Sequence, residues 1–302
     1  MLKRTLLFTN PVYLSTKSEQ LCIQTKERQI IEPIPIEDIG VLMLENAEIS
    51  VSQNAINKLL ANNVAVIYCN EKHYPAGMLL PLEANTLQSE RFSAQISASL
   101  PLKKQLWQQT IIAKIKNQAL LLEYRGKNAL PLYYKAKHVK SDDTTNEEGQ
   151  AARHYWSEVF LPVYVVRERF GYPPNNLLNY GYAVLRAAVA RALVGSGLLP
   201  TLGIHHHNRY NAFCLADDII EPYRPWVDWL VGDIVANDEF GEYELTTQNK
   251  KILLGVLTAD VEINGQRSPL LVALSQTTAS LVRCFEGESK EIIYPKFIPP
   301  SQ

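Results

Sequence analysis

The spacing of apolar residues changes once along this chain, near residue 87, and this change limits the folds available to it. Before it, short segments rich in β-branched residues alternate with turn formers, as is typical of strands. After it, apolar residues recur every three to four positions, which predicts helices. We therefore expect an α+β fold, with a β-rich N-terminal domain over residues 1–86 and a larger all-α domain over residues 87–302.

The same patterns predict the individual elements. The expected strands are 4–8, 12–15, 20–25, 28–33, 36–44 and 64–69. The expected helices are 50–60, 87–100, 101–124, 147–169, 177–194, 225–236, 246–258 and 269–285. The first strand is followed by Pro11 rather than by glycines, so a glycine-rich phosphate loop at that place is excluded.

Composition narrows the class of protein. Apolar residues make up 46% of the 302 positions and charged residues 20%, which is ordinary for globular domains. The net charge is −1, so nucleic-acid binding would need positive charge gathered on one face. The four cysteines are far apart in sequence, so we expect neither a disulfide framework nor a structural zinc site. Because no apolar run is long enough for a signal peptide or a membrane span, a soluble cytoplasmic protein without membrane association is expected.

The densest group of metal-ligating residue types lies between Gly203 and Pro225. Its members are His205, His206, His207, Asp217, Asp218 and Glu221. The histidines precede a short predicted helix that carries the acids, and a solvated polar loop is the alternative interpretation of such a run. Because a residue before proline is pushed out of the helical region, the helix should end or kink at Glu221. A carboxylate at a helix C-terminus favours a nearby positive charge, which Arg224 or a bound cation could supply.

A second acidic group, Glu147 and Glu148, begins a predicted helix. Acids in the first turn complement the helix dipole, and this structural role alone explains them. Gly149 lowers helix propensity there, which suggests that another group approaches the backbone closely. Two carboxylates and one imidazole form a suitable ligand set for Mg²⁺ or Mn²⁺ and leave positions open for phosphate oxygens.

Basic residues are interleaved with aromatic residues around both acidic groups. They include Arg153, Arg167, Arg209 and Arg224. Such residues can hold phosphates and splayed bases, although each one also fits an ordinary helix surface.

Three segments carry a family resemblance. They are Glu148-Gly149-x-Ala151-Ala152-Arg153-x-Tyr155-Trp156, Asn175-Asn176-Leu177-Leu178-Asn179-Tyr180-Gly181-Tyr182, and Gly203-x-x-His206 followed by Asp218-x-x-Glu221-Pro222-Tyr223-Arg224-Pro225. With the stretches 36–44 and 64–69, they make nearly the whole chain resemble the CRISPR-associated integrase family, the catalytic subunit of spacer acquisition. The Glu-Pro-aromatic-Arg-Pro form is most similar to the type II branch.

The resemblance implies a metal site of Glu148, His206 and Glu221, binding Mg²⁺ or Mn²⁺. His205 and His207 become candidates for phosphate contact, beside Arg153, Arg167, Arg209 and Arg224 as DNA-binding candidates. Asp218 matches a second acid of the family pattern. The position of Glu221 is often Asp in other branches.

The activity implied is that of a metal-dependent endonuclease and integrase, in which the 3′-hydroxyl of a captured DNA fragment attacks a phosphodiester at a repeat. The implied partners are double-stranded DNA, a second copy joined through the N-terminal domain, and a small companion protein. Two dimers assemble around a companion dimer, and the type II effector nuclease also participates. The alternatives are a DNA-binding subunit that no longer turns over and a general metal-dependent phosphodiesterase.

Overall fold

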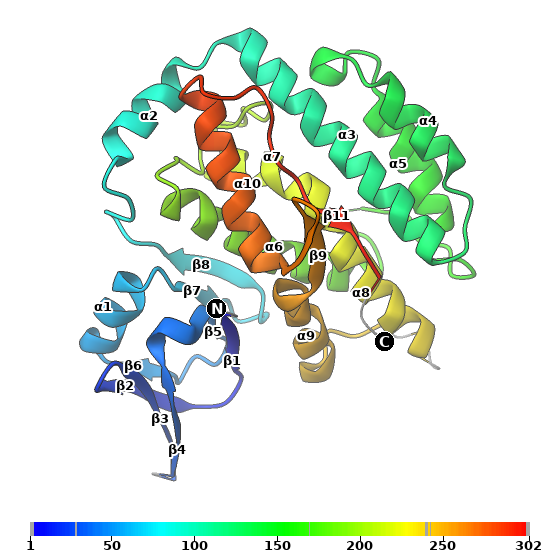
Figure 1. Cartoon of the computed structure of the whole chain (residues 1–302). Coiled ribbons are helices and arrows are strands. Elements are labelled where there is room, and N and C mark those ends of the chain that lie inside the picture. Colours follow the sequence, from blue (N-terminus) through cyan, green and yellow to red (C-terminus); the bar gives the residue numbers. More distant parts are fainter. Residues whose placement is uncertain (1–2, 28, 169, 239–240, 242, 300–302) are drawn as a thin grey trace. The chain divides into compact units, whose positions relative to one another are not determined.

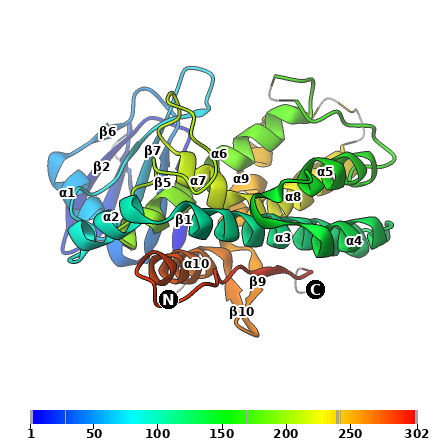
Figure 2. The same ribbon diagram turned by 90° about the horizontal axis from the view of Figure 1, so that it is seen from above.

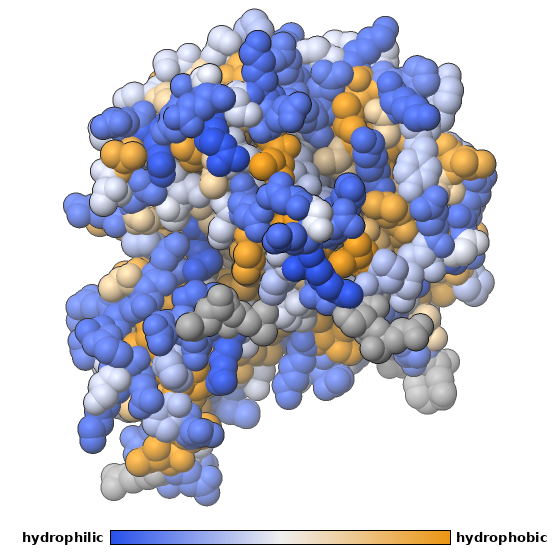
Figure 3. All heavy atoms as spheres, in the orientation of Figure 1, coloured by the Kyte–Doolittle hydropathy of each residue, from blue (hydrophilic) through white to orange (hydrophobic). Residues whose placement is uncertain are grey.

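The computed structural model describes residues 3–27, 29–168, 170–238, 241 and 243–299. The chain divides into two compact units, Met1–Thr86 and Leu87–Gln302. The first is rich in strands and the second is mainly helical, which confirms the expected fold class. No helix among the described residues is long and apolar enough to cross a membrane. The face drawn in Figure 3 is largely hydrophilic, with apolar side chains in small separate groups.

The first unit contains two four-stranded sheets and one helix. The first sheet has the order β1-β5-β7-β8, in which β1, β5 and β7 are parallel and β8 is antiparallel to β7. The second has the order β4-β3-β2-β6. The bounds are β1 Arg4–Phe8, β2 Val12–Lys17, β3 Gln20–Thr25, β4 Ile30–Pro35, β5 Ile39–Leu44, β6 Ser50–Val51, α1 Gln53–Ala61, β7 Ala65–Cys69 and β8 Pro75–Leu79. Every side chain of β5 is buried, which explains its uninterrupted apolar sequence.

The second unit is built around α3, whose neighbours α4 and α5 lie beside it in both views (Figures 1 and 2). The first half of this unit holds α2 Gln88–Ser97, α3 Leu100–Tyr124, α4 Leu130–His138, the 3₁₀ turn η2 Ser141–Asp143, α5 Glu147–Glu158 and α6 Asn175–Gly195. The second half holds α7 Cys214–Ile220, η3 Glu221–Tyr223, α8 Arg224–Asn237, α9 Thr247–Leu254, η4 Gly255–Thr258, β9 Asp260–Ile263, β10 Gln266–Pro269, α10 Leu270–Phe285 and β11 Lys296–Phe297. The Ser99 side chain caps α3, and Pro101 lies in its first turn.

Three features of this unit differ from the sequence analysis, and one of them is the helix α4, which none of the expected helices covers. The helix expected over 147–169 is wrong in extent, because α5 ends at Glu158 and Arg169 lies outside the described residues. Pro162 disfavours a helical conformation at Leu161, and the valines that follow add no helical pattern. A small sheet with the order β10-β9-β11 was not anticipated. Its hairpin turns at Asn264-Gly265, where both residues have positive φ, a pair that favours this turn.

Asn117 on α3 forms hydrogen bonds that attach two segments distant in sequence to this helix. Its Nδ2 donates to the carbonyl oxygens of Pro222 at 2.8 Å and Pro295 at 3.0 Å, and its Oδ1 accepts from the Phe297 N–H at 3.0 Å. The residue is 1% exposed, so water cannot replace these bonds. The turn that carries Glu221 is therefore attached directly to α3.

Asp228 on α8 joins three helices inside the same unit. The hydroxyl of Tyr155 on α5 donates to Oδ2 at 2.6 Å, and the hydroxyl of Tyr182 on α6 donates to Oδ1. Burial raises the pKa of Asp228 to about 6, although both hydroxyls and the charges of Arg224 and Arg167 oppose this shift.

Replacing Asn117 by Ala should lower the unfolding temperature of the full chain by about 5–10 °C, because three buried backbone groups lose their partner. Thermal unfolding measures the change. Lys116→Ala, at the neighbouring exposed position on α3, is the matched control and should stay within about 1–2 °C of the parent. Equal unfolding temperatures for the two variants would show that the Asn117 hydrogen bonds do not hold the turn that carries Glu221.

The raised pKa of Asp228 predicts a pH-dependent stability. Its folded-state pKa lies above the ordinary carboxyl value, so its contribution is complete below about pH 4 and is lost as pH rises through about 6. Asp228→Asn cannot titrate. The stability of the parent relative to this variant should therefore fall by on the order of 2 kcal/mol between pH 4 and 7.5, seen as a change in the difference of unfolding temperatures. If the unfolding temperatures of the parent and of Asp228→Asn change equally with pH over that range, the prediction is contradicted.

Candidate active site

Glu148 lies in the first turn of α5, and its backbone is fixed by two side chains. The carboxylate of Asp143 accepts from the N–H groups of Glu147 at 2.9 Å and Glu148 at 3.0 Å, and Asn146 Oδ1 accepts from the Gly149 N–H at 3.1 Å. A Cβ on Gly149 would lie 2.6 Å from Asn146 Oδ1, so the expected close approach to this glycine is made by the helix cap. The cap therefore sets where the Glu148 side chain leaves the helix.

Asp218 holds the backbone of the loop that contains His205, His206 and His207, which we call the histidine loop. Its carboxylate is fully buried and accepts from the backbone N–H groups of Ile204 at 2.7 Å, His205 at 3.0 Å and His206 at 3.2 Å. A Cβ on Gly203 would lie 2.4 Å from the carbonyl oxygen of His206, so only glycine fits where the loop closes on itself. With its oxygens engaged in this way, Asp218 positions the loop rather than offering oxygens to a cation.

His206 is held by the same carboxylate, with its Nδ1 2.5 Å from Asp218 Oδ1. When Nδ1 carries the proton, Nε2 is the nitrogen left for a ligand, as in carboxylate–histidine–metal arrangements. Hydrogen bonding to Asp218 raises the pKa of His206, although burial opposes the shift. The ring also meets Trp107 edge-on, with 5.6 Å between ring centroids.

Glu221 follows α7 at the start of η3, so the helix ends where Pro222 predicted. It is 5% exposed, and its Oε1 lies 2.7 Å from Arg224 Nη2, the positive charge expected nearby. Burial raises the pKa of Glu221, but the charges of Arg224 and Lys114 outweigh it and hold this pKa below its ordinary value. The carboxylate is therefore ionised and rigidly placed.

Lys114 connects the two glutamates, and the sequence analysis missed it. Its ammonium lies 2.5 Å from Glu148 Oε1 and 2.6 Å from Glu221 Oε2, and the residue is 8% exposed. The only signal in the sequence is a lysine among the buried positions of α3, between Ile111 and Ile115. Such an interruption of an apolar stripe marks a buried charge that needs a partner.

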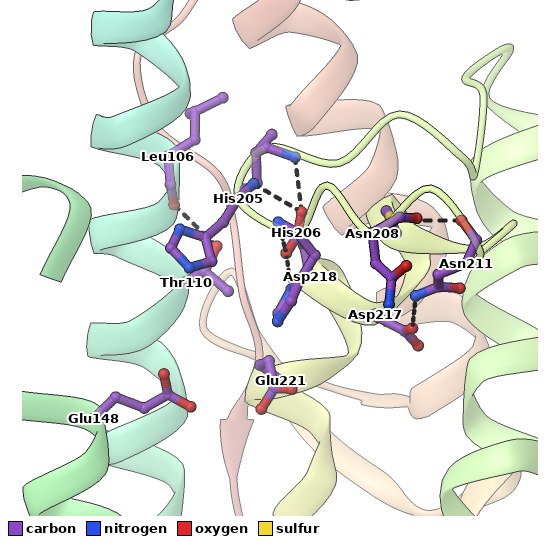
Figure 4. Close-up of polar contacts among 12 residues, drawn as sticks. Leu106, Thr110, Glu148, His205, His206, Asn208, Asn211, Asp217, Asp218 and Glu221 are labelled. Carbon is purple, nitrogen blue, oxygen red and sulfur yellow. Dashed lines mark hydrogen bonds and ion pairs between the residues drawn. The ribbon is translucent and has the colours of Figure 1, made fainter. Parts of the chain in front are cut away.

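The three predicted ligands come from separate segments and face one another. Glu148 extends from α5, Glu221 from the turn after α7, and His206 from the loop above that turn (Figure 4). Among the described residues, no three His, Cys, Asp or Glu side chains are close enough to enclose a metal ion. The donor types nevertheless suit a hard divalent cation, and a cation, the Lys114 ammonium, already lies between the two carboxylates. The residues therefore fit Mg²⁺ or Mn²⁺ if this ammonium moves aside.

The remaining histidines and Asp217 have surroundings of their own. The ring of His205 stacks on Trp107 with 4.1 Å between centroids, and its Nδ1 lies 3.4 Å from Asp142 Oδ1. Asp217 accepts from Asn211 Nδ2 at 2.6 Å. His207 is exposed in the loop.

The arginine candidates fall into two groups. Arg167 donates to the side-chain oxygens of Asn175 and Asn179, both at 2.9 Å, and Arg224 pairs with Glu221, so both have partners within the protein. Arg153 and Arg209 are exposed, and Arg209 lies over the ring of Tyr210 with 4.6 Å to its centroid. The exposed pair is better placed to reach a ligand from solution.

Comparisons with known proteins agree with this architecture. A sequence profile described as "CRISPR associated protein Cas1" matches residues 5–259. The chain is 35% identical to a protein named CRISPR-associated endonuclease Cas1 from Neisseria meningitidis serogroup C, over 98% of this chain and 97% of that protein.

Solved structures give the same result for the fold. A casposase bound to integration product superposes with a TM-score of 0.76 at 21% identity, covering 96% of this chain and 92% of the casposase. A chain of a Cas6-RT-Cas1–Cas2 complex superposes with a TM-score of 0.72 at 19% identity, covering 95% of this chain and 35% of that one. The profile match and the relative of nearly equal length show that this chain belongs to the CRISPR-associated Cas1 family.

Proposed function

We propose that this chain is a metal-dependent DNA endonuclease and integrase of CRISPR adaptation, which inserts captured DNA fragments into the repeat array as part of antiviral defence. One observation carries the proposal: Glu148 and Glu221, from segments far apart in sequence, converge on a single cation, the Lys114 ammonium, and the charge of Glu221 acts on the His206 imidazole. Family membership and the casposase likeness support integration as the reaction.

In the proposed reaction, the 3′-hydroxyl oxygen of a captured fragment forms a bond to a backbone phosphorus at the repeat. The bond from that phosphorus to the target strand's 3′ oxygen breaks, and this oxygen takes up a proton as the attacking hydroxyl loses one. A bound Mg²⁺ or Mn²⁺ supplies activation of the attacking oxygen and stabilises charge on the phosphate. Glu148, Glu221 and Nε2 of His206 would hold it.

The surrounding residues keep these ligands in place. Arg224 fixes one oxygen of Glu221, Asp218 fixes the imidazole of His206, and Asp143 fixes the backbone of Glu148. This positioning matters because the rate of a catalysed reaction falls when the catalytic groups shift by about 1 Å.

DNA would reach this centre along the exposed basic groups. We assign first contact with phosphates to Arg153, His207 and Arg209, which are exposed. His205, Arg167 and Arg224 would contribute closer to the reacting phosphate, where their partners within the protein already orient them.

The proposed assembly is a homodimer joined through the N-terminal unit, with two dimers around a dimer of a small companion protein and double-stranded DNA. The superposition with a Cas6-RT-Cas1–Cas2 complex supports a companion of the Cas2 kind. The likeness to a Neisseria meningitidis relative supports the type II assignment, in which the effector nuclease also takes part.

Glu148→Gln and His206→Ala should each reduce strand transfer at least about 100-fold, because each removes one ligand. The assay incubates protein, with and without its companion, with labelled DNA and a repeat-bearing plasmid in Mn²⁺ or EDTA. Glu147→Gln, at the position next to Glu148, is the matched control and should keep most activity. Full integration by His206→Ala would refute the ligand assignment.

The same assay separates the alternative functions. Hydrolysis of labelled DNA without strand transfer would indicate a general phosphodiesterase. DNA binding without any metal-dependent reaction would indicate a subunit that no longer turns over. Strand transfer in Mn²⁺ that EDTA abolishes is the result expected here.

Asp218→Ala should reduce strand transfer more strongly than Asp217→Ala, because only Asp218 holds the His206 ring and the loop backbone. We expect a loss of about 100-fold against less than about tenfold. Thermal unfolding run in parallel checks that both variants remain folded. Equal losses would place both acids in the same role.

A further inference from the structure

The Lys114 ammonium lies at the point where the two proposed metal-binding carboxylates meet. It contacts Glu148 Oε1 at 2.5 Å and Glu221 Oε2 at 2.6 Å. Its side chain is 10% exposed and that of Glu221 is 7% exposed, so water screens this pair weakly. Two carboxylates this close repel each other unless a positive charge lies between them.

Arg224 cannot take over this bridging position. It pairs with the other oxygen of Glu221, Oε1, at 2.7 Å, and its guanidinium lies over the Tyr182 ring, 4.7 Å from the centroid. These contacts hold the guanidinium on the far side of the Glu221 carboxylate. Lys114 has a flexible four-carbon stem and a compact charge, so its ammonium can leave and return without moving α3.

The charges of this cluster balance without a metal ion. Two carboxylates, Glu148 and Glu221, face one ammonium, Lys114, and one guanidinium, Arg224. A divalent cation that enters must displace the ammonium or share the carboxylates with it, and in both cases it meets positive charge. These four side chains therefore predict weaker metal binding than two carboxylates alone would give.

We propose that Lys114 is a built-in cation that holds Glu148 and Glu221 together when no metal is bound and competes with the divalent metal for them. The proposal rests on the proposed function in that these carboxylates are taken as the metal ligands. Lys114 is a positioning residue in this role, because it acts through the two glutamates.

The test uses the full-length protein without DNA and Lys114→Met, which keeps the length of the side chain and removes its charge. Mn²⁺ alone is the probe, and its binding is followed by the electron paramagnetic resonance signal of the free ion. We expect Lys114→Met to bind Mn²⁺ at least about tenfold more tightly. In EDTA the same variant should unfold several degrees below the parent, and saturating Mn²⁺ should restore more stability to it than to the parent.

Two further variants make the outcome specific. Lys114→Arg keeps the charge and should retain both the weak Mn²⁺ binding and the stability in EDTA. Lys135→Met removes a half-buried lysine of α4 that pairs with Glu147 at 3.2 Å on the same helix as Glu148, outside the cluster. It should leave the Mn²⁺ affinity unchanged.

Mn²⁺ affinity that is equal or lower in Lys114→Met, together with unchanged stability in EDTA, would overturn the proposal. Failure of the proposed function has a different signature, in which Mn²⁺ binding survives both Glu148→Gln and Glu221→Gln. In that case the ligands were assigned wrongly, and the stability in EDTA alone decides whether Lys114 holds the two carboxylates together.

Discussion

The buried carboxylate of Asp218 is the interaction on which the arrangement of this site depends. It accepts three backbone N–H groups and the imidazole of His206, and so replaces the hydrogen bonds that a tight loop would otherwise make with water. Gly203 allows this closure because a side chain there would collide with the loop's own backbone.

The long helix α3 contacts each of the separate segments that form the site and so fixes their positions relative to one another. Asn117 attaches the turn before Arg224, Trp107 stacks against the histidine loop, and Lys114 contacts both glutamates. These residues lie within three turns of one helix, so their spacing is set by helix geometry. The site is therefore rigid where α3 contacts it, although its proposed ligands come from three segments and Glu148 precedes the other two by more than fifty residues.

Features set by local sequence could be predicted, and those set by tertiary contacts could not. Pro222 predicted the helix end at Glu221, and Gly149 predicted a close approach to the start of α5. The partner of Gly149 and the bridging role of Lys114 depend on chain segments that meet only after folding. The helix expected to reach residue 169 failed because apolar spacing outweighed Pro162 in that interpretation.

Under the proposed function, the charge balance at Lys114 would also connect metal binding with DNA binding. With its two carboxylates, ammonium and guanidinium the cluster is neutral, so a divalent cation leaves it with an excess of two positive charges. A backbone phosphate at the same place reduces that excess and gives the displaced ammonium a new anionic partner. Each ligand then strengthens binding of the other, as thermodynamic linkage requires. If the proposed ligands hold a divalent cation, this arrangement would hold it firmly only when DNA is present.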